Sequence, residues 1–205
     1  FVLFDLDSAF ETNSPFTLLE SRQIFTFNEI YDTGEILTEE IKLVTIFLNL
    51  LDNDVFRKKF IDTFCLVAGS VFEPKRCKDI INKLAERIYS TLQQEGQNPY
   101  NTGNNIITSL SNRQQIMIRA LKNYWKFKLS DINEQKVKLS SNIQEARILL
   151  NDQIVPTNKF EGTLFGPVSI STSTPPGYKF LGWMSQNNTV DSEEIIFSKS
   201  SVRWK

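Results

Sequence analysis

The hydrophobic positions in the middle of the chain recur with a helical period. Between residues 38 and 128, apolar residues lie three or four apart, which predicts an all-helical region of about four helices. Gly69 and Gly96 are expected to end two of them. The predicted buried stripes consist of Phe56, Phe60, Phe64, Ile80, Leu84 and Ile88.

The last of these helices is expected to begin late. Residues 96–105, "GQNPYNTGNN", are rich in Asn and Gly and indicate a polar loop. Ser111 with Gln114 has the spacing of a capping box, in which each side chain bonds a backbone N–H at the start of a helix. We therefore expect a helix from there to about Phe127.

From about residue 134 the period changes to two, which is typical of strands. Residues 136–198 are predicted to form a compact antiparallel β unit, with "TPPG" (174–177) at a turn and Tyr178, Phe180 and Trp183 partly in its core. Strands that follow helices, without alternating with them, indicate an α+β fold. The strand candidates are "KVKLSS", "ARILLND", "GPVSISTST", "YKFLGWM" and "EEIIFS".

Three zones follow from these patterns. Residues 1–34 are predicted to form strand and loop, residues 35–130 a helical subdomain, and residues 131–205 a small β-rich subdomain. The first zone opens with "FVLFDLDSAF", in which an apolar run leads into Asp5 and Asp7.

Charge and hydropathy argue against two classes of partner. The net charge is −1 and no run of six Lys or Arg occurs, whereas binding to nucleic acid needs a clustered basic excess. The longest apolar stretch, residues 41–51, is shorter than the roughly 20 residues of a membrane helix. We therefore expect neither a nucleic-acid partner nor a membrane span.

Missing residue types narrow the chemistry further. The sequence has no His, which excludes Ser-His-Asp and Cys-His catalysis and His-bound zinc. Cys65 and Cys77 are twelve apart and form no CxxC motif; Cys65 is expected to be a buried thiol, and a disulfide between the two stays open. Catalysis would have to use carboxylates, Lys, Arg, Tyr or Ser.

Asp5 and Asp7 are the candidate metal ligands. Side chains two apart on a strand point to the same face, and two carboxylates on one face can hold Mg²⁺ or Mn²⁺. The alternative is chance, because ten aspartates produce such a pair readily. A second pair, Asp52 and Asp54, is better explained as the start of a helix.

Two further clusters also have structural interpretations. In "FRKKF" (56–60) the cations are typical of a solvated helix face, although Arg57 could reach a neighbouring carboxylate. Trp125, with Tyr124 and Phe127, resembles a stacking platform, but aromatic residues at helical spacing usually belong to a core.

Several stretches, in the right order, resemble the CotH kinases, a family named for a spore-coat protein. "FVLFDLDSAF" resembles the family's Asp-x-Asp segment, and "FRKKFI" followed by "FEPKR" resembles its helical stretch. Residues 146–184, with "GYKFLGW", resemble the β region that follows, and "SSVRWK" resembles the opening of a further strand.

This resemblance implies a function and a location. It implies the helical C-lobe portion of an atypical bacterial protein kinase, secreted or at the cell surface, extracellular or periplasmic, with ATP and Mg²⁺ or Mn²⁺ as cofactors. Asp5 or Asp7 would hold the metal, as the Asp-Phe-Gly aspartate does in protein kinases. Its partner would be a protein substrate or another coat or surface protein.

The resemblance also implies that this sequence is a fragment of a larger chain. The nucleotide-clamping lobe and the catalytic-loop Asp would lie upstream, so the fragment alone is expected to be inactive. Two alternatives stay open: a non-catalytic coat or surface scaffold, and an adhesive β domain carried on helices. A sugar-binding domain would need Tyr178 and Trp183 exposed.

Overall fold

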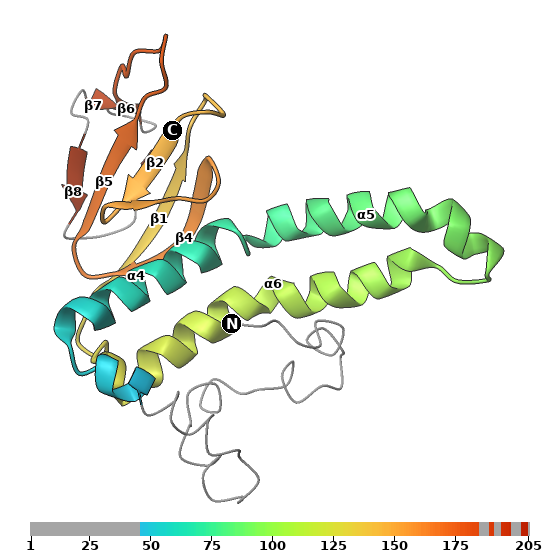
Figure 1. Ribbon diagram of the computed structural model, residues 1–205, viewed down its shortest axis with the longest axis horizontal. Helices are drawn as coiled ribbons and strands as arrows, with labels where there is room; N and C mark the ends of the chain where they lie inside the picture. Colours follow the sequence, from blue (N-terminus) through green and yellow to red (C-terminus); the bar gives the residue numbers. More distant parts are fainter. Residues whose placement is uncertain (1–45, 185–188, 191–193, 198–201, 205) are drawn as a thin grey trace, which may run out of the picture.

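Three helices lead into a β region in the part of the chain that the structure describes. The computed structural model describes residues 46–184, 189–190, 194–197 and 202–204. Within them, α4 (Asp54–Ser70), α5 (Pro74–Gln94) and α6 (Pro99–Asn123) precede a 3₁₀ turn, η2 (Trp125–Phe127), and the strands come after it. Figure 1 shows α4 beside the strands and the α5–α6 hairpin projecting away from them. The α+β class is confirmed.

Helix α4 begins at a side-chain cap and ends near a glycine. The side chain of Asn53 accepts a hydrogen bond from the Phe56 N–H at 3.0 Å and so caps the first turn. The helix ends at Ser70, one residue beyond the predicted stop, and Gly69 lies inside its last turn and is not a left-handed cap. Gly69 faces the ring of Phe160, and its missing side chain serves close packing there.

Helix α6 begins thirteen residues earlier than expected, since its N-cap is Asn98 and not Ser111. Asn98 caps it by accepting from the Tyr100 N–H, and Pro99 occupies the first helical position. The predicted polar loop is therefore wrong beyond Asn98, because an Asn-Pro pair is itself a helix start signal. Ser111 lies inside the helix, where its hydroxyl donates to the Ile107 carbonyl.

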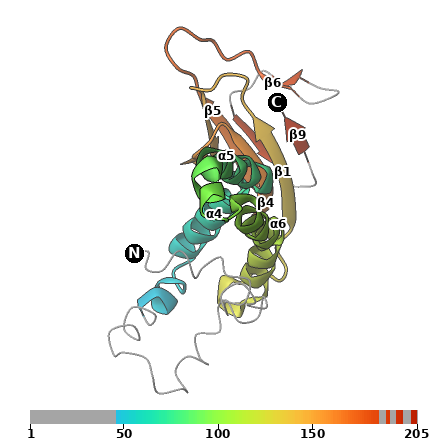
Figure 2. The ribbon, with the colours of Figure 1, turned by 90° about the vertical axis from the view of Figure 1, so that its right-hand side faces the viewer.

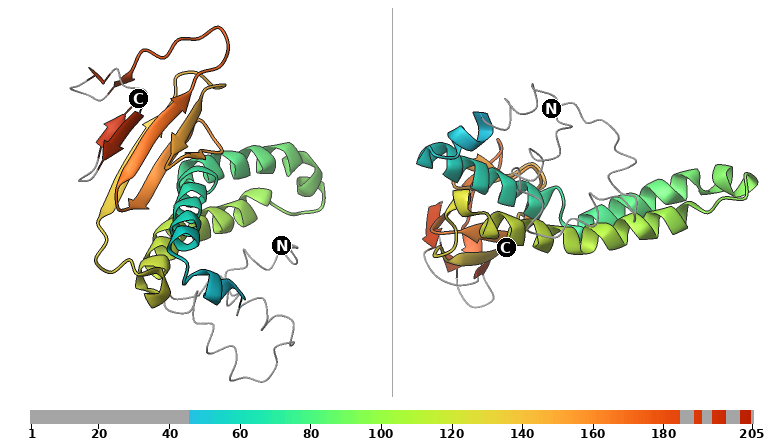
Figure 3. Two further views of the ribbon diagram at one scale, coloured as in Figure 1. Left: turned by 60° about the vertical axis from the view of Figure 1, so that its left-hand side comes forward. Right: turned by 90° about the horizontal axis from the view of Figure 1, so that it is seen from below.

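The predicted burial of the apolar stripe of α5 is wrong at Ile80, Leu84 and Ile88, which are 39%, 52% and 47% exposed. Cys77 and Ala85 are the buried residues of this helix. Figures 2 and 3 show the reason: the outer part of the hairpin extends beyond the strands, so α5 is covered by α6 and by no third described layer.

The described strands form two larger sheets and one small pair. One sheet has the order β4-β1-β9, the second β3-β2-β5-β8, and β6 pairs with β7. Among the described pairs, β1 with β9 is parallel and the others are antiparallel. The strands are β1 (Glu134–Ser140), β2 (Arg147–Leu150), β3 (Gln153–Ile154), β4 (Lys159–Phe165), β5 (Val168–Ser173), β6 (Trp183–Met184), β7 (Thr189–Val190), β8 (Glu194–Phe197) and β9 (Val202–Trp204).

Most predicted strands are present, but "YKFLGWM" is a strand only at Trp183–Met184, and β3, β4 and β7 were not predicted. Strand β1 alternates as expected, with Val137 and Leu139 buried and Lys136 and Lys138 exposed. The longest of the strands that were not predicted is β4, which pairs with β1 along its full length. Gly162 in its middle weakens the strand pattern, because glycine lowers strand propensity and contributes no side chain.

The "TPPG" segment forms the predicted turn. The Tyr178 N–H donates to the Pro175 carbonyl at 3.2 Å, and Gly177 adopts φ +85°, a conformation that suits glycine. Trp183 is buried and Phe180 packs edge-on against it, with ring centroids 5.6 Å apart. Tyr178 is 52% exposed, so its predicted place in the core is wrong.

A single hydrophobic core joins helices and strands. It includes Ile61, Cys65 and Leu66 from α4, Ala120 and Leu121 from α6, and side chains from β1, β2, β4 and β5. The core therefore runs across the expected boundary between the helical and β-rich zones, and the division into domains stays a prediction. The strand side chains in it include Val137, Leu139, Ile148, Leu150, Phe160, Leu164, Val168 and Ile170.

Candidate functional site

The predicted metal ligands, Asp5 and Asp7, lie outside the described residues. Across residues 46–184 and the three short strands beyond them, no three Asp, Glu or Cys side chains lie close enough to hold a metal ion. The metal site predicted at Asp5 and Asp7 stays a prediction.

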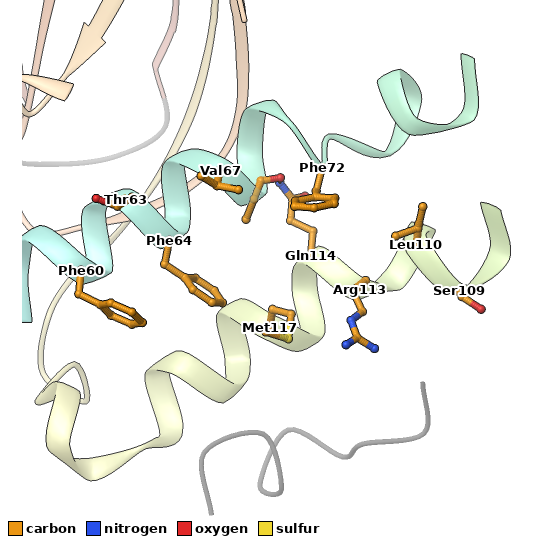
Figure 4. Close-up of a pocket in the computed structure, with 11 residues that line it drawn as sticks. Phe60, Thr63, Phe64, Val67, Phe72, Ser109, Leu110, Arg113, Gln114 and Met117 are labelled. Carbon is orange, nitrogen blue, oxygen red and sulfur yellow. The ribbon is translucent and has the colours of Figure 1, made fainter. Parts of the chain in front are cut away.

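An apolar groove lies between α4 and α6 in the described residues, and we call it the α4–α6 groove. It encloses about 460 Å³. Figure 4 shows aromatic side chains of α4 extending toward α6 across this space. Its lining consists of Phe60, Thr63, Phe64, Val67, Ala68, Phe72, Ser109, Leu110, Arg113, Gln114 and Met117.

The groove exists because α4 is apolar on two sides. Ile61, Cys65 and Leu66 point into the core, whereas Phe60 and Phe64 lie on the adjacent side at helical spacing. The predicted stripe of Phe56, Phe60 and Phe64 is thus only partly buried, packed against the edge of the core. The ring of Phe60 stacks on Phe127 at 5.6 Å, with 2° between the planes.

One glutamine fixes the two walls of the groove. The side-chain N–H₂ of Gln114 donates to the Ala68 carbonyl of α4 at 3.1 Å and to the Glu161 carbonyl of β4 at 3.0 Å. It thereby connects α6, α4 and β4. Sequence analysis assigned Gln114 to a helix cap, and no local pattern identifies its real partners, which are 46 and 47 residues away.

The close packing of α4 on β4 depends on two glycines. A Cβ atom placed on Gly162 would lie 3.0 Å from the Cα of Gly69, and one placed on Gly69 would lie 2.5 Å from the Phe160 ring. Helix and strand therefore approach backbone to backbone here. Sequence analysis found neither role.

Arg57 has a structural role. It is buried, donates to the Leu51 carbonyl at 2.6 Å and forms an ion pair with Asp54. The alternative that Arg57 reaches a neighbouring carboxylate is confirmed. Asp52, the other member of this second Asp-x-Asp pair, accepts from Lys126 at 3.0 Å.

Neither cysteine is an active thiolate candidate. Both are buried and free, so the structure has no disulfide between them. Burial raises the pKa of the Cys65 thiol strongly, and the neighbouring Asp62 raises it further. Burial also raises the pKa of Cys77. Both groups stay protonated at neutral pH and are weak nucleophiles.

The aromatic cluster after α6 divides between surface and core. Phe127 is buried, whereas Trp125 is 71% exposed. Lys126 lies 5.4 Å from the centre of the Trp125 ring and is also hydrogen-bonded to the Leu48 carbonyl. Trp125 is therefore the member of this cluster that could stack against a partner.

Comparison with known proteins gives one match. A sequence model of the family described as CotH kinase protein matches residues 1–130. No curated protein and no solved structure matches the chain. The matched range covers the Asp-x-Asp segment, all three described helices and η2. No helix of the described residues is long and apolar enough to cross a membrane.

Proposed function

Because this chain belongs to the CotH kinase protein family, we propose that it forms part of an ATP-dependent protein kinase. The reaction would transfer a phosphoryl group from ATP to a hydroxyl group of a protein. The observation that carries this proposal is the family match over residues 1–130, a range that includes Asp5 and Asp7.

In this proposal Asp5 is the metal ligand, with Asp7 as the alternative. Carboxylate oxygens are the ligands that Mg²⁺ and Mn²⁺ prefer, and a bound ion would neutralise charge on the phosphates of ATP. The described helices would support the segment that carries these residues. The absence of His leaves a carboxylate as the natural choice for holding the ion.

Single substitutions in the full-length protein test this assignment. We expect Asp5→Ala to lower Mn²⁺-dependent phosphotransfer by about 100-fold or more, the loss typical of removing a transition-state charge contact. The same measurement on Asp7→Ala shows which of the two aspartates is the metal ligand. Asp52→Ala is the matched control, since it alters an Asp-x-Asp pair whose carboxylate contacts Lys126 at the surface.

The possible results separate the hypotheses. Loss of activity in Asp5→Ala or Asp7→Ala, with Asp52→Ala unchanged, supports the proposal. An active protein in which both variants keep near-normal activity refutes the site. A folded full-length protein without any phosphotransfer would support a coat or surface scaffold.

We also propose a location outside the bacterial cytoplasm, at the cell surface or in a spore coat, as the sequence resemblance implies. Fractionation of the native host, with protease treatment of intact cells, tests this proposal. The adhesive alternative needed Tyr178 and Trp183 exposed. Tyr178 is 52% exposed, but Trp183 is buried, so only one of the two rings could contact a sugar.

A further inference from the structure

The chain between β5 and β6 protrudes from the β region, and we call residues 174–184 the apolar loop. Figures 1, 2 and 3 show it at the end of the strands that lies away from α4. Three of its large apolar side chains are open to solvent: Tyr178 is 52% exposed, Leu181 79% and Met184 55%. The Trp183 ring of the same loop is buried, so one side of the loop packs on the core and the other side does not.

The exposed side chains of the apolar loop call for an explanation. One exposed apolar residue is common on a protein surface, but three within seven residues form a local apolar patch. Such patches mark contact sites for proteins or membranes. The apolar loop also lies outside residues 1–130, where the family model matches, so the kinase family domain does not account for it.

The polar groups of the apolar loop are few. Lys179 is the only charged residue between positions 162 and 184, and this stretch contains no carboxylate. Pro175 and Pro176 have no backbone N–H, and the Tyr178 N–H is already hydrogen-bonded to the Pro175 carbonyl at 3.2 Å. Little hydration would therefore be lost if the loop entered an apolar phase, where each unpaired polar group is costly.

The shape of the apolar loop favours a lipid bilayer over a protein partner. A protein would need a pocket complementary to three projecting side chains, whereas fluid lipid chains adapt to them. Tyr is enriched at membrane interfaces, where its ring is apolar and its hydroxyl stays hydrated. The turn is already closed, with Gly177 at φ +85°, so the loop loses little freedom on binding.

We propose that the apolar loop inserts into the interface of a phospholipid bilayer and holds the protein on a membrane surface. Leu181 and Met184 enter the boundary of the acyl chains, the Tyr178 ring lies among the headgroups, and the Lys179 ammonium binds lipid phosphate. Even a single acyl chain on a protein gives only reversible membrane binding, so this contact is reversible too. It does not cross the membrane, and it is independent of phosphotransfer.

Vesicle flotation measures this contact. The full-length protein is mixed, at several millimolar lipid, with vesicles of phosphatidylcholine or of phosphatidylcholine and phosphatidylglycerol in equal parts. We expect binding to both, and stronger binding to the anionic vesicles. Leu181→Asp should lower the partition coefficient by about tenfold or more, because burying one leucine side chain is worth at least that factor. Val55→Asp is the matched control at an 80% exposed position of α4, and it should leave the partition coefficient unchanged.

Three results would overturn the proposal. A folded protein that binds neither kind of vesicle would show that the apolar loop has no affinity for lipid. Equal binding by Leu181→Asp and by the unaltered protein would assign the contact to another surface. Self-association that is lost in Leu181→Asp, measured by sedimentation without lipid, would show that a second copy covers the loop.

A nitroxide spin label measures the depth of the loop directly. The label is attached to Leu181→Cys, with Val55→Cys as the control, while Cys65 and Cys77 are buried in the folded protein. When vesicles are added, the label at position 181 should become less accessible to a water-soluble nickel complex and more accessible to oxygen, which concentrates among acyl chains. The label at position 55 should not change. Unchanged accessibility at position 181 in vesicle-bound protein would contradict insertion.

Discussion

Replacing Gly69 with alanine tests the close approach of α4 and β4. A Cβ atom at this position would lie 2.5 Å from Cε2 and 2.8 Å from Cζ of Phe160. Real Cβ atoms do not approach other atoms so closely, and Phe160 is only 1% exposed, so its ring has little room to move. Either the ring leaves its rotamer or the helix moves off the strand.

Two opposing effects determine the magnitude. Overpacking a well-filled core costs about 1–3 kcal/mol. Alanine is the better helix former and recovers up to about 1 kcal/mol of that in the interior of α4. A contact at 2.5 Å belongs at the upper end of the overpacking range. We therefore expect Gly69→Ala to lower the free energy of unfolding by about 1–2 kcal/mol.

Urea unfolding followed by circular dichroism measures this change as a shift of the midpoint. A second substitution, Phe160→Leu, removes part of the ring that the new methyl group would meet. The double variant should therefore be more stable than the sum of the single changes predicts, by about 0.5–1 kcal/mol or more. A Gly-to-Ala change at an exposed helix position stabilises a protein. If Gly69→Ala alone has this effect, the packing of α4 on β4 described here is wrong.

Three further outcomes are expected from the same unfolding assay. Phe60→Ala should lower the free energy of unfolding by about 3 kcal/mol, because the Phe60 ring stacks on Phe127. Leu84 is half exposed on α5, so Leu84→Ala should lower it by less than about 1 kcal/mol. Equal losses in the two variants would contradict the assigned burial. Gln114→Leu should cost about 1–3 kcal/mol, because two backbone carbonyls lose their side-chain donor, and an unchanged midpoint would show that these bonds contribute nothing. The raised pKa of Cys65 predicts that the free energy of unfolding falls as pH rises above about 8.5, since the thiol ionises in the unfolded chain while it stays protonated in the folded one. Cys65→Ala should reduce this dependence of stability on pH. An unchanged dependence would refute the assignment to Cys65.

Local signals in the sequence were sufficient for several features. The alternation of β1 and the proline-glycine turn at 174–177 depend on neighbouring residues, and both were predicted correctly. The α+β class followed from the change of period near residue 134. The family resemblance also needed only the order of short phrases, and the match over residues 1–130 confirms it.

The tertiary structure decided what local signals leave open. Gly69 lies one residue before the end of α4, where a local rule explains it as a helix stop, but its close approach to Phe160 of β4 is what requires a residue without a side chain. Gln114 satisfies a capping pattern, yet its amide bonds carbonyls of α4 and β4. Both partners are distant in sequence, and a local pattern carries no information about them.

The burial of the helical stripes shows the same limit. Phe60 on α4 and Leu84 on α5 belong to apolar stripes of the same period, and only the stripe on α4 packs against the edge of the core. Periodicity determines which face of a helix is apolar. The amount of water excluded from that face depends on which element lies opposite, and that is set by the arrangement of the whole chain.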